Sequence, residues 1–320
     1  MNGNFIISLD LELFWGVHDE KKASAYHSNL KETPKAIERL LATFVDYSIH
    51  ATFATVGFLM GNKDTDISKH FSDLLPSYTN KNLSPYQKLT KHSADTEDTY
   101  FALPLIKKIA TTSGMEIASH TFSHYYTLEE GQQASEFQAD LISAISIANE
   151  HQIDLQSIVF PRNQYNDTYL AVCKKLGIAI YRGNEKSWIY KPEAWSKETL
   201  FKKGIRLIDS YINLTGNHTY KPQLINGFLN LPSSRFLRPY SSKLACLQAL
   251  KLRRIRKAMT YAAKNKLTYH LWWHPHNFGS NLEKNMAFLT KILDHYQELN
   301  ATYGFKSQNM KDIHTTLSNL

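Results

Sequence analysis

The sequence predicts an α/β fold in which parallel strands alternate with helices and close into a barrel. Three observations lead to this prediction: short apolar runs typical of buried strands recur along the chain, segments with helical spacing separate several of them, and 320 residues with 42% hydrophobic content suffice for one large core. Parallel strands require long crossover connections, which helices provide. Single barrels of this kind commonly reach this length, so we expect one domain over residues 1–320.

Eight short apolar runs lack a helical period and are therefore predicted strands. They are residues 4–10, 50–56, 115–119, 157–161, 177–181, 206–210, 226–231 and 268–273. Helical patterns lie between several of these runs, at residues 34–47, 100–112, 133–150, 167–175 and 284–298. This alternation is typical of a parallel barrel.

Residues 60–98 interrupt the alternation. This stretch is rich in Asn, Asp, Ser, Thr and Lys, and it is too long and too polar for a simple connection between a strand and a helix. It is expected to be an insertion that either covers the functional site as a lid or decorates the surface.

The net charge of +8 is concentrated in one region. No acidic residue occurs between Asp209 and Glu283, and within this region residues 242–264 combine an apolar stripe with basic side chains. The segment is predicted to be a basic amphipathic helix. A solvated outer face is the simplest interpretation, and attraction to an anionic membrane surface or to a phosphate-bearing substrate is the alternative. Nucleic acid is not an expected partner, because no nucleic-acid-binding motif accompanies the charge.

The first strand begins within a few residues of Met1, without the basic and apolar regions of a secretory signal. No apolar stretch approaches the roughly 18 residues of a membrane span. We therefore expect a cytoplasmic protein, with peripheral contact at the inner face of the membrane as the variant that the basic helix suggests. The only cysteines, Cys173 and Cys246, are expected to be reduced.

Two carboxylates stand at the end of the first predicted strand, in the sequence Asp10-Leu11-Glu12. Side chains alternate along a strand, so Asp10 and Glu12 share a face about 7 Å apart. One of them could hold a metal ion while the other stays free as a base. The spacing leaves open which carboxylate takes which part.

Two histidines follow the third predicted strand. His120 and His124 are four residues apart, a spacing that can converge on one ion. With a carboxylate from the first strand they make a set of two imidazoles and one carboxylate. This set suits zinc with an open position for water, and other first-row divalent ions fit it less closely.

Further polar residues follow two other predicted strands. Arg162 lies in the sequence Phe160-Pro161-Arg162-Asn163-Gln164, where it could pair with a carboxylate from a neighbouring strand and keep it ionised. The last strand ends in Trp272-Trp273-His274, which places another imidazole at a strand end. His274 is favoured over His276 because of this position.

These segments together resemble the polysaccharide deacetylases of carbohydrate esterase family 4, in the NodB-homology superfamily, which hydrolyse N-acetyl groups of sugars. The resemblance extends from Ser8-Leu9-Asp10-Leu11-Glu12 through the paired histidines to the terminal histidine motif. It implies a distorted (β/α)7 barrel of the polysaccharide deacetylase type. By the same resemblance, Asp10 is the base, Arg162 is the partner of the base, and His274 is the acid. The metal ligands implied are Glu12, His120 and His124.

The chain departs from the common pattern of this family at two motifs. Leu11 separates the two carboxylates, and no Gly follows the motif that contains Arg162. The second form resembles deacetylases associated with surface-polysaccharide assembly. The implied substrate is an N-acetyl amino sugar in a biosynthetic intermediate of an O-antigen-like or capsule polymer, linked to a nucleotide or a lipid.

Two other functions stay open at this point. The first is a cytoplasmic amidohydrolase or deformylase that acts on another small amide, and the second is a non-catalytic glycan-binding protein on the same fold. Four aromatic residues could stack on apolar sugar faces or simply fill the core. They are Trp15, Tyr165, Trp272 and Trp273.

Overall fold

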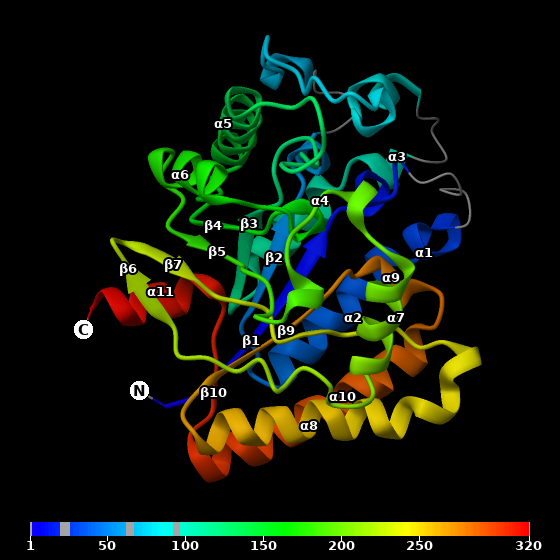
Figure 1. Ribbon diagram of the computed structural model, residues 1–320, viewed down its shortest axis with the longest axis vertical. Helices are drawn as coiled ribbons and strands as arrows, with labels where there is room; N and C mark the ends of the chain where they lie inside the picture. Colours follow the sequence, from blue (N-terminus) through cyan, green and yellow to red (C-terminus); the bar gives the residue numbers. More distant parts are fainter. Residues whose placement is uncertain (1, 20–25, 62–66, 92–96, 320) are drawn as a thin grey trace.

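The fold is built on one curled, mostly parallel sheet in a computed structural model that describes residues 2–19, 26–61, 67–91 and 97–319. The strand order is β6-β7-β5-β4-β3-β2-β1-β9-β8, and β10 pairs with the start of β1. Figure 1 shows β1 in the middle of the molecule, with β2 and β9 beside it. The strands are β1 (Asn4–Leu11), β2 (Ala51–Thr55), β3 (Met115–Ser119), β4 (Ser157–Ile158), β5 (Ile180–Tyr181), β6 (Gln223–Ile225), β7 (Phe228–Asn230), β8 (Arg235–Phe236), β9 (Thr268–Trp273) and β10 (Lys306–Ser307).

Helices connect most of these strands and cover the outside of the sheet (Figure 1). They are α1 (His27–Lys31), α2 (Thr33–Asp46), α3 (Glu97–Tyr100), α4 (Leu103–Thr111), α5 (Ala134–Glu150), α6 (Asp167–Lys175), α7 (Leu200–Asp209), α8 (Gln248–Lys264), α9 (His276–Gly279), α10 (Leu282–Tyr303) and α11 (Met310–Ser318). The sheet and its helices form the distorted barrel that the sequence predicts.

One segment closes the barrel between β5 and β9. Residues 228–231 pair with β5, and the chain then bends so that β8 pairs with β9. Within the bend, the Ser233 N–H donates to the Gly183 carbonyl and the Ser234 N–H donates to the His270 carbonyl, both at 2.8 Å. The segment therefore acts as one bent strand that completes a seven-stranded circuit through β1, β2, β3, β4, β5 and β9.

Successive side chains of β1 point alternately into the barrel and outward to the helices, as the pleat of a strand requires. Ile6 packs in a buried cluster with residues of the other strands and with Met310 and Ile313 of α11, which covers one end of the barrel. Phe5 and Leu9 belong instead to the large core that the helices share. Asp10 lies on the interior face, two pleats beyond Ile6.

Seven of the eight predicted strands are confirmed, with shorter bounds for several of them. Residues 206–210 were expected to form a strand, and this prediction is wrong, because they belong to the end of α7 and the turn that follows. The apolar residues Phe201, Ile205, Ile208 and Ile212 recur at helical spacing over a longer window. The Thr199 hydroxyl accepts a hydrogen bond from the Lys202 N–H and so caps the start of the helix.

The predicted basic helix at 242–264 is confirmed as a short 3-10 turn, Ser242–Leu247, followed by α8. Its basic side chains are not all on a solvated face. Lys251 and Arg254 are buried, and they donate to the backbone carbonyls of Arg238 and Gly216, respectively. Two of the seven basic residues of this segment therefore hold the fold together, while Arg253, Lys257 and Lys264 are exposed.

The described part of the 60–98 insertion packs against the body of the protein, while residues 62–66 and 92–96 lie outside the described residues. The Tyr78 hydroxyl accepts a hydrogen bond from the Tyr126 N–H at 2.8 Å, and the carbonyl of Leu83 lies 3.2 Å from Nε2 of His18. Within the described ranges, no helix combines the length and apolar character needed to cross a membrane.

Candidate metal centre and catalytic residues

The polar residues singled out in the sequence meet at one end of the barrel. Registers place Leu11 beside Thr55, Thr55 beside Ser119, and Leu9 beside Trp273, so these parallel strands end together. Residues that directly follow the strands therefore share one edge. In barrels of parallel strands, this carboxyl-terminal edge is where active sites form.

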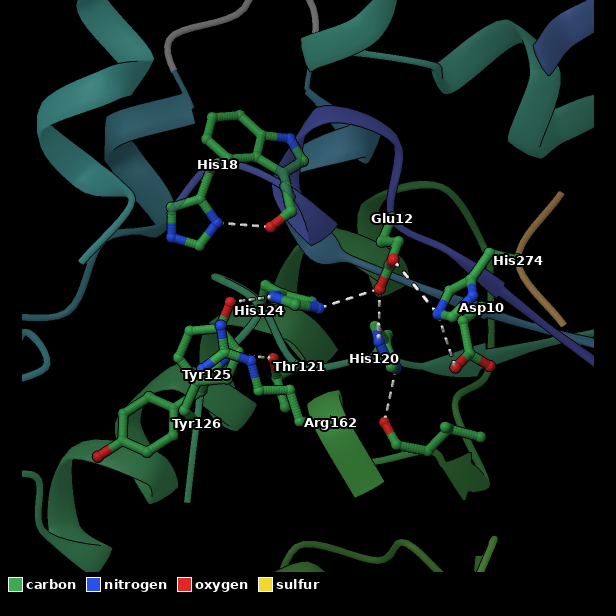
Figure 2. Close-up of polar contacts among 12 residues, drawn as sticks. Asp10, Glu12, His18, His120, Thr121, His124, Tyr125, Tyr126, Arg162 and His274 are labelled. Carbon is green, nitrogen blue, oxygen red and sulfur yellow. Dashed lines mark hydrogen bonds and ion pairs between the residues drawn. The ribbon is translucent and has the colours of Figure 1, made fainter. Parts of the chain in front are cut away.

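Three buried side chains converge there. Oε2 of Glu12 lies 3.0 Å from Nε2 of His124 and 3.3 Å from Nε2 of His120, as Figure 2 shows. The three ligand atoms lie within 4.8 Å of one another. Both imidazoles thus present the same nitrogen to one carboxylate oxygen, which is the arrangement expected of metal ligands.

The surroundings of the histidines fit a metal as well. Nδ1 of His120 lies 2.8 Å from the Val159 carbonyl, which can only accept, so Nδ1 carries the proton and Nε2 presents its lone pair. Nε2 of His120 is buried and has no hydrogen-bond partner among the described residues. The Tyr126 hydroxyl lies 3.1 Å from Nδ1 of His124 and can hold that ring in the same way.

The charges of the group are also those that a metal requires. Burial lowers the pKa of His124 to about 4, so this ring is neutral near pH 7. Burial alone would raise the pKa of Glu12, but the charge of His274 and the hydrogen bonds with His120 and His124 hold it well below its usual range. A buried carboxylate and neutral imidazoles form a donor set that suits a divalent ion.

The loop that carries the histidines is held by α5. Asp140 accepts hydrogen bonds from the N–H groups of Phe122 and Ser123, at 2.7 and 3.1 Å. The backbone takes positive φ at Thr121 (65°) and His124 (58°), a conformation that side chains rarely adopt. The buried hydrogen bonds to Asp140 therefore help to maintain a strained loop that directs both rings to Glu12.

Asp10 forms a buried ion pair with Arg182, which the sequence analysis did not identify. Nη1 and Nη2 of Arg182 donate to the two carboxylate oxygens of Asp10 at 2.7 and 2.9 Å. Arg182 also donates to Ser8 and to Asn163, and its guanidinium lies 4.3 Å from the ring of Trp272. Burial alone would raise the pKa of Asp10, but the charge of Arg182 outweighs it and holds the pKa below its usual range.

The predicted pairing of Arg162 with Asp10 is wrong. Arg162 donates to Asp19 at 2.5 Å and to Glu129 at 3.4 Å, and its guanidinium lies 4.0 Å from the ring of Tyr126. Figure 2 shows it on the Tyr126 side of the group, away from Asp10. The neighbouring Asn163, not Arg162, contacts Arg182, and both Arg162 and Asn163 have positive φ (55° and 52°).

Arg182 carries the same signal in the sequence that singled out Arg162. It follows directly after a predicted buried strand, residues 177–181. A charged residue at this position faces the barrel edge where the other polar residues meet. The signal identifies both arginines, and it does not distinguish which one reaches Asp10.

His274 faces both carboxylates. Its Nε2 lies 3.4 Å from Oε1 of Glu12 and 3.7 Å from Oδ2 of Asp10 (Figure 2). The Asn277 side-chain amide nitrogen lies 3.3 Å from Nδ1 of His274, and an amide NH2 can only donate, so the proton of the neutral ring sits on Nε2. The ring therefore directs an N–H toward the carboxylates.

His276 is buried beside His274. Glu12, His274 and His276 make a second group whose ligand atoms lie within 4.8 Å of one another. Nδ1 of His276 has no hydrogen-bond partner among the described residues. Only the group with His120 and His124 has both rings oriented by neighbouring protein groups, which makes it the better candidate for a metal.

A cavity of about 650 Å³ opens next to His274. Trp272, Trp195 and Phe236 contribute aromatic surface to its lining, and Arg162 and Asn184 contribute polar groups. Of the four aromatic residues proposed for sugar stacking, Trp15 and Trp273 are fully buried in the core and cannot contact a ligand.

Comparison with family models gives a match over part of the chain. The family model described as "Polysaccharide deacetylase" matches residues 28–181, a little under half of the chain. The matched segment contains His120, His124 and Arg162, and it ends just before Arg182. No curated protein sequence matches the chain.

Several solved structures share the fold. A Mycobacterium smegmatis protein assigned as a polysaccharide deacetylase superposes with a TM-score of 0.61 at 14% identity, covering 100% of this chain and 92% of its own. A Pseudomonas aeruginosa protein with the same assignment gives 0.60 at 9% identity, covering 99% and 91%. A GH57-type branching enzyme from Pyrococcus horikoshii gives 0.55 at 11% identity, covering 97% and 69%. At these identities the likeness establishes the fold alone.

Proposed function

We propose, with the polysaccharide deacetylase match of residues 28–181 as the premise, that this protein is a metal-dependent deacetylase that hydrolyses the N-acetyl group of an amino sugar. One observation carries the proposal: Glu12, His120 and His124 converge beside an Asp10–Arg182 ion pair and His274. Hydrolysis of an amide requires an activated water, stabilisation of the carbonyl oxygen and a proton for the departing nitrogen. The proposed groups can supply each of these.

Glu12, His120 and His124 would hold the metal, with zinc as the first candidate because two imidazoles and a carboxylate suit it. A divalent ion at this position supplies Lewis-acid chemistry that polarises an acetyl carbonyl and acidifies water. The Val159 carbonyl and the Tyr126 hydroxyl orient the two rings. Asp10 is the poorer ligand candidate, because both of its oxygens already accept hydrogen bonds from Arg182.

Asp10 would act as the base. Arg182 lowers its pKa, so the carboxylate is ionised near neutral pH and can accept the proton of the attacking water. A weak base still serves when the water itself is acidified. Arg182 holds the carboxylate in one orientation through two hydrogen bonds, which keeps the accepting oxygen in place.

His274 would act as the acid. In its protonated, imidazolium form, its Nε2–H faces the region between Asp10 and the cavity, and the ring returns to neutral when that proton leaves. Donation from this nitrogen to the sugar amine would let the C–N bond break without releasing an unprotonated amide anion.

The substrate that we propose is an N-acetyl amino sugar in a surface-polysaccharide biosynthetic intermediate, carried on a nucleotide or a lipid. The cavity supports this proposal by its size and its lining. A volume of about 650 Å³ is typical of ligand pockets, and Trp272 and Trp195 offer faces on which a sugar ring can stack. Cationic side chains in the lining, Lys203 and Arg238 among them, suit the phosphate of such a carrier.

The test is to incubate the purified protein with N-acetyl amino sugars and to measure acetate, before and after removal of metal with a chelator. Acetate release that stops on chelation and returns with zinc would support the proposal. Release of formate or ammonia from other amides, with no acetate from any sugar, would favour the amidohydrolase or deformylase alternative. Glycan binding without turnover under every metal condition would favour the non-catalytic alternative.

Metal content provides a second and independent test. His120→Ala and His124→Ala should each lower bound zinc from about one ion per chain to near zero, because either change removes one of three protein ligands. His27→Ala is the matched control, since it removes an exposed imidazole outside the group. Undiminished metal in both ligand variants, measured by elemental analysis, would refute the assignment.

The roles of the two carboxylates can be separated in the same way. Asp10→Asn should keep the metal and lose several orders of magnitude in turnover, whereas Glu12→Gln should weaken metal binding itself. The opposite pattern would exchange their roles.

A further inference from the structure

Helix α7 presents an apolar face to the solvent. Phe201, Ile208 and Ile212, which follows the helix, expose 70%, 49% and 55% of their surface, and Ile205 is partly exposed between them. These positions are spaced by three or four residues, so they form one continuous stripe along the helix. Single exposed apolar residues are ordinary, but a continuous stripe marks an interaction site.

The opposite face of the same helix lines the cavity next to His274. Lys203, Arg206, Leu207 and Ser210 all contribute to its wall. At 100° per residue these positions lie about half a turn away from Phe201 and Ile208. An ordinary surface helix buries its apolar side and exposes its charges. Helix α7 does the reverse, with cations toward the cavity and apolar side chains outward.

Exposed cations precede α7 in the sequence. Lys186, Lys191 and Lys197 lie in the turns just before α7 and are exposed. The two acidic residues of this stretch are engaged, Glu193 with Lys202 and Glu198 with Arg206. The surface around α7 therefore carries uncompensated positive charge.

Two exposed tryptophans lie in the same stretch. Trp188 and Trp195 expose 59% and 45% of their surface, and both belong to short 3-10 turns before α7. Tryptophan is enriched where proteins meet the headgroup region of a bilayer, because its ring has both apolar and polar parts. Trp195 lies on the cavity side of α7, because its ring is 3.9 Å from Nζ of Lys203, so Trp188 is the tryptophan on the solvent side. An apolar helical face with tryptophan and lysine nearby is typical of a helix that lies in a membrane interface.

We propose that α7 docks on an anionic membrane surface, so that the adjoining cavity receives an amino sugar linked through phosphate to a membrane lipid. The docking stands on the surface of α7 alone, while the identity of the substrate rests on the proposed deacetylase function. Inserting the stripe would bury its apolar side chains, and the neighbouring lysines would attract anionic headgroups.

A membrane fits this face better than a second copy of the chain. A twofold contact through α7 would bring the same lysines of both copies together, which like charges oppose. An anionic surface pairs with those lysines instead. The face of one ten-residue helix is also small for a stable dimer, which usually buries about 800 Å² on each partner.

The cavity side of α7 is suited to the phosphate of a lipid-linked sugar. Arg238 donates through Nε to Ser210 at 2.8 Å, and Nζ of Lys203 lies 3.9 Å from the ring of Trp195. Among the described residues, neither cation forms an ion pair with a carboxylate. Both therefore keep their charge available to a phosphate in the cavity, which His274 also lines.

The docking can be tested by sedimentation with vesicles of phosphatidylcholine alone and of phosphatidylcholine mixed with phosphatidylglycerol. The wild-type protein should bind the anionic vesicles more strongly. The double variant Phe201→Ser/Ile208→Ser should bind them about tenfold less or weaker, because two large apolar side chains no longer insert. The matched control, Val45→Ser/Ile225→Ser, removes two apolar side chains of similar exposure on other faces (54% and 63%) and should bind like the wild type.

The charge contribution is tested separately. Lys186→Gln/Lys197→Gln should reduce the preference for anionic over neutral vesicles, since each nearby lysine adds electrostatic attraction. All of these side chains are exposed, so the variants should unfold at the wild-type temperature, which a thermal scan checks. Absence of vesicle binding, or equal binding by the α7 variant and the wild type, would overturn the proposal.

The substrate part is tested with the same N-acetyl sugar in two forms, one water-soluble and one joined through phosphate to a lipid in vesicles. The ratio of kcat/KM on the lipid form to that on the soluble form should fall about tenfold in the α7 variant and stay constant in the control. A ratio of kcat/KM that stays constant in both the α7 variant and the control variant would overturn the substrate part of the proposal. A wild-type dimer that the α7 changes convert to a monomer would instead identify the face as an interface between copies.

Failure of this proposal and failure of the proposed function give different results. A protein that binds anionic vesicles through α7 but releases no acetate from any sugar would disprove the deacetylase function and leave the docking intact. A protein that deacetylates soluble sugars but ignores vesicles would keep the function and lose the docking.

Discussion

The candidate base depends on one arginine at a position that is almost fully closed to solvent. Arg182 and Asp10 are both buried, with two hydrogen bonds between them and further hydrogen bonds from Arg182 to Ser8 and Asn163. Removing one member of a buried pair leaves the other charge without compensation, which usually costs about 3–5 kcal/mol. The Asp10–Arg182 ion pair therefore supports both the proposed chemistry of the site and the stability of the fold.

Substitutions of Arg182 and Arg162 should show which of the two arginines controls the pKa of Asp10. In Arg182→Gln the pKa of Asp10 should rise, because the charge that lowers it is gone, so the acidic limb of kcat/KM against pH should move to higher pH. The free energy of unfolding should fall by about 3–5 kcal/mol. Arg162→Gln should leave the acidic limb in place, since that side chain contacts Asp19 and Glu129 instead. A shift in the Arg162 variant alone would restore the pairing that the sequence suggested.

At the scale of elements, the loop after β3 determines whether the two histidines converge. Its backbone is held by Asp140 of α5, which contacts two N–H groups and also the Ser123 hydroxyl. Burial raises the pKa of Asp140 to about 6, so holding an ionised carboxylate there has an energetic cost that the hydrogen bonds offset. Helix α5 thus shapes the metal group without touching it.

Asp140→Ala should weaken metal binding at a distance. Two buried N–H groups would lose their acceptor, at about 1–3 kcal/mol each, and the loop would no longer be held in its strained form. We expect lower stability in denaturant and a metal affinity reduced about 10- to 100-fold, the usual effect of losing an outer support of a metal site. Titration with zinc measures the affinity, and an unchanged value would show that the loop holds its shape unaided.

Helix α11 is joined to the residue just before β2 by a titratable pair. Nδ1 of His50 lies 2.6 Å from Oδ2 of Asp312, and this hydrogen bond raises the pKa of His50. A raised pKa means that the folded state binds the proton more tightly than the unfolded state. The contribution to stability is therefore complete below about pH 6.5, the ordinary value for histidine, and is lost as the pH rises through the raised pKa.

His50→Gln should remove this pH dependence. As the pH increases from about 5 to about 9, the thermal midpoint of the wild type should fall relative to that of the variant. The fall should occur where the pH passes through the raised pKa of His50. The effect should be small because both side chains are partly exposed. Parallel pH curves for the two proteins would show that the pair contributes nothing measurable.

At the scale of the whole molecule, one buried ion cluster joins three elements that are distant in sequence. Asp209 at the end of α7 accepts a hydrogen bond from Arg235 of β8 at 2.6 Å, and Arg254 of α8 lies 4.0 Å away. This cluster withdraws two of the eleven cationic side chains of residues 210–282 from the surface. It also fixes the end of α7, and with it one wall of the cavity.

Asp209→Asn should destabilise the protein by about 3–5 kcal/mol, because Arg235 would remain buried without a counter-charge. Glu283→Gln is the control, since it breaks an exposed pair with Arg39, and pairs of that kind contribute about 0–1 kcal/mol. Unfolding in urea measures both values. Equal and small effects would show that Arg235 does not depend on Asp209 as its counter-charge.

The sequence by itself determined most strands of the barrel and the residues at their ends. Strand direction and the alternation of side chains are local properties, so Asp10, Glu12, His120, His124 and His274 could be assigned to one edge before any contact was known. Only the tertiary structure decided which arginine serves Asp10, because that depends on how the sheet curls and on the loop after β4, which places Arg162 against Asp19 and Glu129. It also decided the environment of α7 and α8. An apolar stripe or a run of cations has the same appearance in sequence whether it packs inward or faces solvent, and the neighbouring elements determine which of the two occurs.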